Sequence, residues 1–123
     1  YDLDSLAFKE WEKYANTAGI EATTPFLPNA YDATFILGLA IEMAGSEDLE
    51  KIATSIRDIA NSPGEKILPG EWEKAKLLIS SGESIDYIGA SGKIQFDDKG
   101  DVIGNYSINI IADTSWKSII IDQ

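Results

Sequence analysis

Residues 28–45 read PNAYDATFILGLAIEMAG and form the apolar stretch that is considered first for the fold. Its apolar side chains recur at the three- and four-residue steps of an α-helix. Because proline is tolerated in the first turn, the helix is expected to begin near Pro28 or Asn29, and Gly45 is a natural stop. Within the stretch only Asp32 and Glu42 are charged. A helix this apolar on nearly every side is expected to be the central and most buried one.

Three further helices are expected to flank the central one. Asp4 or Ser5 can accept hydrogen bonds from the free N–H groups of the first, and Ser46 is the expected cap of the third helix in chain order. Each ends in residues typical of turns, with glycine prominent among them. Apolar spacing predicts these helices from about Ser5 to Ala18, from the Ser46 cap to the turn at residues 61–64, and between Pro69-Gly70 and Ser81-Gly82.

The apolar pattern changes from a helical period to a period of two at about Ser91–Gly92. Residues 93–97 and 106–110 alternate as strands do, and residues 116–121 end in three isoleucines, as in a strand buried on both faces. The fold class expected is α/β, with about four helices followed by a β-hairpin and a final strand. Such a final strand needs cover on both sides, and we expect the second cover to lie outside this chain.

The composition excludes several classes of function. The chain has 123 residues, with 10 Lys and Arg against 21 Asp and Glu, so its net charge is −11. That charge repels phosphate backbones, so nucleic acid is not an expected partner. The chain contains no Cys and no His, which rules out a Ser-His-Asp triad, a Cys nucleophile and a Cys/His zinc site built by this chain alone. An enzyme is the least expected class.

Two loops invite a binding interpretation that their spacing does not support. Residues 97–101 cluster carboxylates, but Val102 stands where a calcium loop of the EF-hand type needs glycine and Ile108 where it needs glutamate. A polar hairpin turn is therefore predicted. Residues 89–92 read GASG and lack phosphate-loop spacing, so they are expected to turn the chain into the strands. We expect neither a metal nor a cofactor.

Short motifs follow one another in a recognisable order over roughly residues 5–112. They are Tyr31-Asp32-Ala33, Glu42-Met43-Ala44-Gly45, Pro69-Gly70-Glu71-Trp72, Ile85 to Gly92, Ile94-Gln95-Phe96-Asp97, Gly100-Asp101-Val102 and Tyr106. This order and spacing resembles the C-terminal part of type I solute-binding proteins. The resemblance is to the branched-chain amino-acid (Leu/Ile/Val-type) receptors of ABC importers in particular.

The resemblance implies a two-lobed α/β protein with a ligand cleft between its lobes. Residues 1–104 would be the closing helices and turn of the N-terminal lobe. Residues 105–123 would be the hinge crossing and the final strands of the C-terminal lobe, with Gly104, Asn105 and Tyr106 at the hinge. The family residues that hold the ligand's carboxylate and ammonium groups have no matching segment here, so the chain would be a fragment lacking most of the site.

One ligand-binding position is carried over from the family. An aromatic residue after proline, five residues before the helix tyrosine, tends to face the ligand side chain, and in this chain it is Phe26. The competing interpretation makes Phe26 a hydrophobic staple that packs onto the next helix. Asn29 and Tyr31 are weaker candidates, with helix cap and core as their alternative roles.

The resemblance leads to three functional hypotheses. The first is an extracellular or periplasmic amino-acid receptor that delivers its ligand to an ABC permease, possessing no enzymatic activity and anchored to the membrane through a segment absent here. The second is a ligand-sensing receptor domain of the same fold. The third is a self-standing acidic interaction domain. A fragment of a longer fold is also expected to self-associate through its exposed face.

Overall fold

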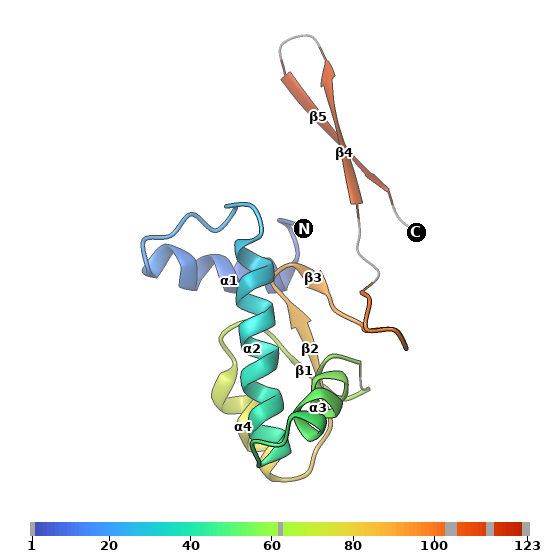
Figure 1. The fold of residues 1–123 in the computed structure, drawn as a ribbon. Helices are drawn as coiled ribbons and strands as arrows, with labels where there is room; N and C mark the ends of the chain where they lie inside the picture. The colour runs from blue at the N-terminus through green and yellow to red at the C-terminus, as the bar shows by residue number, and fades with distance from the viewer. Residues whose placement is uncertain (1, 62, 103–105, 113–114, 122–123) are drawn as a thin grey trace.

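The computed structural model describes residues 2–61, 63–102, 106–112 and 115–121. Four helices surround a small three-stranded sheet, and two further strands form a hairpin that extends away from them (Figure 1). This mixed α/β architecture is consistent with a portion of a type I binding-protein fold. The elements in chain order are α1 Leu6–Thr17, α2 Leu27–Ala44, α3 Leu49–Asn61, β1 Glu65–Ile67, α4 Trp72–Ser80, β2 Ile85–Gly89, β3 Gly92–Lys93, β4 Tyr106–Ala112 and β5 Ser115–Ile121.

The four predicted helices are confirmed, and one of their predicted caps is wrong. The Ser5 hydroxyl accepts a hydrogen bond from the Phe8 N–H at 3.1 Å and caps α1 as expected. Helix α3 begins at Leu49, so residue 48 occupies its N-cap position instead of Ser46. The Asp48 carboxylate accepts from the backbone N–H of Glu50 at 2.9 Å and of Lys51 at 3.3 Å.

Helix α2 is central, but it is buried along only one of its sides. It begins at Leu27, one residue before the predicted start, and ends at the left-handed Gly45. Helices α3 and α4 and strand β2 contact its inner side. On its outward side Leu37 is 46% and Ile41 47% exposed. The helix is therefore central, as predicted, but it is not buried on every side.

Two short strands in the first part of the chain were not predicted. Strand β1 pairs in parallel with β2, in a register that places Ile67 opposite Tyr87. Helix α4 connects the two strands, so β1, α4 and β2 form a βαβ unit. Helical and strand segments are therefore interleaved before residue 91, contrary to the predicted division. With three and five residues, these strands are too short for apolar periodicity to distinguish them from loops.

The main core lies between the β1–β2 pair and helices α2, α3 and α4. It contains fully buried side chains from each layer, among them Leu39, Ile59, Ala75 and Tyr87. A second, smaller cluster lies under α1, where Phe8 and Trp11 pack near Ala90. The two clusters adjoin the same end of α2, because the half-buried Tyr31 packs against both.

The predicted polar turn after β3 is confirmed. Strand β3 covers only two residues, and beyond it Phe96 and Val102 form an isolated antiparallel bridge. The Asp97 carboxylate closes the turn by accepting from the N–H groups of Lys99 at 2.8 Å and Asp101 at 2.9 Å. The Asn61 side chain bonds both the N–H and the carbonyl of Phe96, which attaches this segment to the end of α3.

Strands β4 and β5 lie where strands were predicted, and they form an antiparallel pair with each other. Their register runs from Tyr106 opposite Ile121 to Ala112 opposite Ser115. On β4 the side chains of Ile108, Ile110 and Ile111 are exposed. The predicted burial of the final strand on both faces concerns side chains outside the described residues, as does the predicted hinge at Gly104 and Asn105.

Candidate functional site

The candidate site lies where the N-terminal end of α2 meets the carboxyl ends of β1 and β2 (Figure 1). In open α/β sheets, ligands bind beyond the carboxyl ends of the parallel strands, because the loops there are free to carry binding residues. Here those loops are residues 68–71 after β1 and residues 90–91 after β2. Each is attached to α2 by a side chain of the helix, Tyr31 for the first and Asp32 for the second.

Asp32 is the most heavily bonded side chain of this site. It is 1% exposed, and its carboxylate accepts four hydrogen bonds. Oδ1 accepts from the Tyr87 hydroxyl and the Ala90 N–H, each at 2.8 Å. Oδ2 accepts from the Ser91 N–H at 2.8 Å and from the Ser91 hydroxyl at 2.6 Å. A carboxylate offers about four acceptor positions, so this one is fully used and holds the end of β2 against α2.

The four groups that donate to Asp32 are a phenol, a serine hydroxyl and two backbone N–H groups, and all four are neutral. Burial is the main cause that raises the pKa of the Tyr87 phenol above its ordinary value, and the charge of Asp32 raises it further. The phenol therefore stays protonated at neutral pH and continues to donate to the carboxylate. Within the part of the chain that the structure describes, these four hydrogen bonds come from neutral groups, and bonds of this kind are stronger when the acceptor is a carboxylate.

Gly89 allows the carboxylate to approach β2 this closely. A Cβ atom on Gly89 would lie 2.5 Å from Asp32 Oδ2 and 2.8 Å from the Ile94 Cδ1 atom. Both separations are shorter than nonbonded contact permits. The hydrogen bonds between Asp32 and the end of β2 therefore require a glycine at position 89.

Tyr31 makes the corresponding attachment to the loop after β1. Its hydroxyl oxygen accepts a hydrogen bond from the Gly70 N–H at 2.8 Å. Its ring lies between Trp11, with centroids 4.7 Å apart, and Phe35, at 5.7 Å. Phe35 in turn stacks on Tyr87 at 4.9 Å, so the row of rings runs from α1 through α2 to β2. Burial raises the pKa of the Tyr31 phenol above its usual range.

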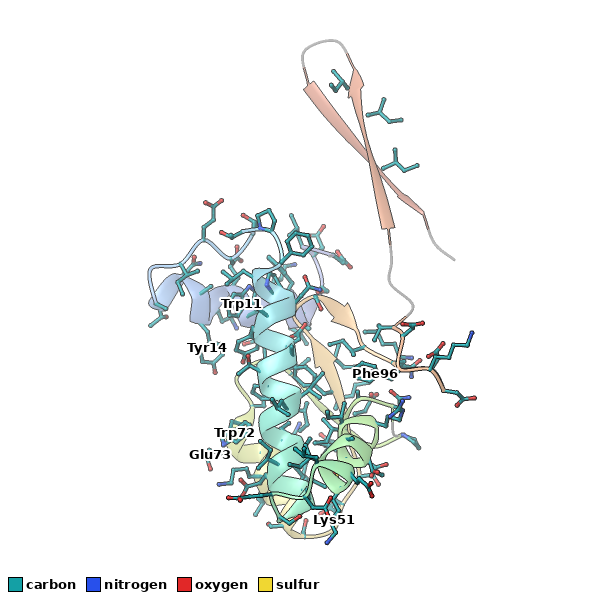
Figure 2. The ribbon with its side chains drawn as sticks, viewed as in Figure 1. Trp11, Tyr14, Lys51, Trp72, Glu73 and Phe96 are labelled. Carbon is teal, nitrogen blue, oxygen red and sulfur yellow. The ribbon has the colours of Figure 1, made fainter. Side chains whose placement is uncertain are left out.

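Trp11 fixes the loop that leads into α2. Its indole N–H donates to the Ala22 carbonyl at 3.2 Å, in a buried position. Figure 2 shows Trp11 on α1 beside the upper part of α2. The loop between α1 and α2 is therefore fixed at its beginning by the hydrogen bond from Trp11, and it ends where α2 begins.

Phe26 occupies the N-cap position of α2 in an unusual conformation. Its φ is 63° and its ψ −4°, in the left-handed region, and among the described residues it is the one non-glycine residue with positive φ. A bulky side chain in this region is strained, typically by about 1–2 kcal/mol. Its ring is 78% exposed, so Phe26 does not pack onto α2 as a hydrophobic staple. Strain of this kind is concentrated at functional sites.

The other two predicted ligand-binding residues lie in the first turns of α2. Asn29 is exposed and stands three residues after the N-cap, so the alternative role as a cap is wrong. Tyr31 is half-buried in the row of rings, as its alternative role in the core predicted. Of the hinge candidates, Tyr106 begins β4, and its side chain lies outside the described residues. The structure thus places Tyr31 against the loop after β1, and it places Phe26 and Asn29 on the exposed surface of the same helix end.

Sequence reasoning missed Asp32 as a site residue, although a signal for it was present. Asp32, Ile36 and Leu39 are spaced by four and three residues, so the carboxylate shares a helix face with core residues. A lone charge on an apolar face needs buried donors. The donors come from residues 87–91, which spacing on α2 alone does not identify.

Two surface hollows of the described part of the chain lie elsewhere on the molecule. One of about 450 Å³ is lined by residues of α2 and α3, including Ala44 and Lys51, and another of about 300 Å³ by Met43 and Ile79 among others. Neither of these is lined by Phe26, Asn29 or Tyr31. In chemical terms the site at the end of α2 offers protonated phenols and a saturated carboxylate. These groups position the loops after β1 and β2 against α2.

The chain has a mixed α/β fold, and comparison with known proteins identifies its family. Residues 6–113 match the family described as "Receptor family ligand binding region", and the chain belongs to that family. It is also similar to the "Chemotactic signal transduction system substrate-binding protein BasB" of Halobacterium salinarum, with 27% identity over 89 residues.

That alignment covers 72% of this chain and 22% of the Halobacterium protein, so the chain spans about a fifth of the relative's length. No solved structure matches the chain. The family and the relative support a ligand-binding receptor of the type I periplasmic-binding-protein superfamily. None of the helices in the described ranges is long and apolar enough to cross a membrane.

Proposed function

We propose that the chain forms part of the N-terminal lobe of a two-lobed receptor for an amino acid, and that the N-terminal end of α2 forms one wall of the ligand cleft. The observation that carries this proposal is Phe26, a strained and exposed aromatic side chain at the carboxyl edge of a parallel strand pair. An aromatic ring in a restrained loop offers apolar contact area at a small cost in side-chain entropy.

The residues behind Phe26 support this role by making the wall rigid. Tyr31 attaches α2 to the loop after β1, and Asp32 attaches it to the loop after β2. A ligand that touches Phe26 would therefore meet a surface already held in place, so little ordering would oppose binding. Asn29, exposed one turn further along α2, is the proposed polar contact of the same wall.

Ligand binding would be coupled to closure of the lobes. In this proposal residues 1–104 belong to the N-terminal lobe and residues 105–123 to the crossing and the last strands of the C-terminal lobe, with Gly104, Asn105 and Tyr106 at the hinge. A ligand that contacts both lobes stabilises the closed form over the open one, which shifts the population toward closure. The ligand is bound and released without chemical change.

Two uses of such closure remain as candidates, transport and sensing. The resemblance to branched-chain amino-acid receptors favours delivery to an ABC permease outside the membrane. The printed name of the Halobacterium relative, a chemotactic signal transduction protein, favours a sensor whose closed form is read by a signalling partner. The alternative to both is a self-standing acidic interaction domain, and a protein of that kind would bind no small ligand.

Calorimetric titration of the receptor that contains these residues, against each of the standard amino acids, tests the proposal. We expect saturable heat for at least one apolar amino acid and about tenfold weaker binding after Phe26→Ala, because the aromatic contact is lost. Leu77→Ala is the matched control, since Leu77 is 70% exposed on α4 and lies outside the proposed wall. Absence of heat for every amino acid would overturn the amino-acid assignment.

A further inference from the structure

The segment that carries Phe26 runs between two points that are packed against the same buried cluster. Ala22 belongs to the cluster of buried residues under α1, and Leu27, the first residue of α2, is half-buried against it. The four residues between them, Thr23 to Phe26, are all exposed. The direction in which the Phe26 side chain projects therefore depends on how firmly Ala22 and Leu27 are held.

The segment ends in a β-turn that requires the left-handed conformation of Phe26. The Leu27 N–H donates to the Thr24 carbonyl at 3.1 Å, so Pro25 stands second and Phe26 third in a four-residue turn. With φ 63° and ψ −4° at Phe26 this is a type II turn, in which proline is common at the second position and glycine is the usual third residue. A bulky residue persists in such a conformation only where the surrounding structure restrains it.

Trp11 of α1 supplies a restraint at the Ala22 end of this segment. Its indole N–H donates to the Ala22 carbonyl at 3.2 Å, in a buried position. Its ring also lies 4.7 Å from that of Tyr31, one turn beyond the start of α2. Trp11 therefore contacts both the beginning of the segment and the helix that follows it. Loss of the indole donor from this buried carbonyl would favour opening of the segment toward water.

We propose that Trp11 is a positioning residue for Phe26. Its hydrogen bond to Ala22 holds the turn in the geometry that presents the Phe26 ring, and Trp11 itself does not touch the ligand. The inference rests on the proposed ligand contact of Phe26. The contacts that carry it are the buried bond to Ala22 and the ring contact with Tyr31, both formed within this chain.

Amide hydrogen exchange tests whether Trp11 holds the turn, without any ligand. In the receptor that contains these residues, Trp11→Phe removes the indole N–H and keeps an aromatic ring beside Tyr31. Mass spectrometry of fragments covering residues 21–30 should then show exchange faster by about fivefold to tenfold, the factor expected for the loss of one hydrogen bond. Unchanged exchange in this segment would overturn the proposal.

Trp72→Phe is the matched control for that substitution. Trp72 packs edge-on against Phe35 at 5.5 Å, so the same truncation is made in the same row of rings. It lies on α4, farther along α2 from the segment before the helix (Figure 2). Trp72→Phe should therefore leave exchange of residues 21–30 unchanged. Equal acceleration in both variants would show a general loss of stability and would also overturn the proposal.

Calorimetric titration with the standard amino acids tests whether Trp11 acts on binding through Phe26. Trp11→Phe should weaken binding by about fivefold, and in the Phe26→Ala background it should cause no further loss, because the ring that it positions is gone. A full additional loss in that background would overturn the positioning role. If Phe26→Ala alone leaves the affinity unchanged, the proposed ligand contact fails, and the exchange measurement decides separately whether Trp11 holds the turn.

Discussion

The hydroxyl of Tyr87 donates a hydrogen bond of 2.8 Å to Asp32 Oδ1, and this bond joins β2 to α2 across 55 residues of sequence. Both side chains are fully buried or nearly so. The same carboxylate accepts from Ala90 and Ser91, so a single residue of the helix determines where the strand ends and its loop begins. The end of α2 that carries Phe26 is fixed to the sheet through this bond.

Replacing Asp32 should destabilise the chain strongly. In Asp32→Asn the amide nitrogen takes the place of one acceptor oxygen, so either the Ser91 N–H or the Tyr87 and Ala90 donors lose their partner. Leaving a buried donor unsatisfied costs about 1–3 kcal/mol, and we expect a loss of about 2 kcal/mol in the free energy of unfolding. Urea denaturation followed by circular dichroism measures this loss.

Tyr87→Phe is the control for that substitution, since it removes one donor and leaves the carboxylate three others. It should lower the unfolding free energy by about 1.5 kcal/mol, within the range for a hydrogen bond to a charged group. The double variant should lose less than the sum of the two single losses, because Asp32→Asn already removes the Tyr87 bond or replaces its charged acceptor by a neutral one. Strict additivity of the two losses would show that the two side chains are not coupled in the folded state.

The close approach of Asp32 and Ile94 to Gly89 predicts that alanine at this position destabilises the chain. Gly89→Ala places a methyl group against Asp32 Oδ2 and Ile94, and overpacking of this kind costs about 1–3 kcal/mol. Gly38→Ala is a matched control, because its methyl would meet only the far edge of the Trp72 ring at 2.9 Å and would gain helix propensity. Equal thermal midpoints for the two variants would contradict the packing described for Gly89.

The raised pKa values of Tyr31 and Tyr87 predict instability at alkaline pH. In the unfolded chain these phenols lose their protons near a pH of about 10. In the folded chain their pKa values are higher, so above that pH the folded state binds more protons and stability falls as pH rises. The contribution is fully present below pH of about 10. Denaturation at a series of pH values should show this decline, and Tyr87→Phe should make it shallower. If the free energy of unfolding of Tyr87→Phe fell with pH as steeply as that of the unsubstituted chain, groups other than Tyr87 would cause the alkaline instability.

Net charge predicts the response to salt. With a charge of −11 the folded chain repels itself, and at about 0.1 M salt the screening length falls to about 10 Å. Sodium chloride added to that level should therefore raise the thermal midpoint by a few degrees. The described ion pairs are few and mostly at exposed side chains, so their weakening should not offset the gain. A midpoint that falls with salt would show that attraction between charges dominates.

The helices were predictable from sequence because each carries a local pattern long enough to recognise. The apolar repeat of α3 and the position of Gly45 are properties of neighbouring residues, and both predictions were correct within a few residues. Strands β1 and β2 were missed because their identity depends on pairing with each other across α4. No local pattern in three residues such as Glu65–Ile67 distinguishes a parallel strand from a loop.

The candidate site was predictable only in part, for a similar reason. Phe26 was proposed from the resemblance to the family, but its left-handed backbone and its exposure are properties of the folded chain. Asp32 could be recognised as a charge on an apolar face, whereas its donors lie more than fifty residues away. The exposure of Leu37 and Ile41 on the outward side of α2 was likewise not predictable, because a helix that is apolar all round gives no indication of which side the rest of the chain will cover.

We propose that Phe26 is held in a strained conformation and that its side chain contacts the ligand. The variant Phe26→Gly tests the strain and the contact separately. Glycine adopts the left-handed region without strain, so the variant should unfold at the same or a higher urea concentration than Phe26→Ala, which retains the strain. In the receptor that contains this chain, calorimetry should show about tenfold weaker amino-acid binding for Phe26→Gly despite its unimpaired stability. Unchanged affinity in Phe26→Gly would contradict the claim that this side chain forms the wall of the ligand site.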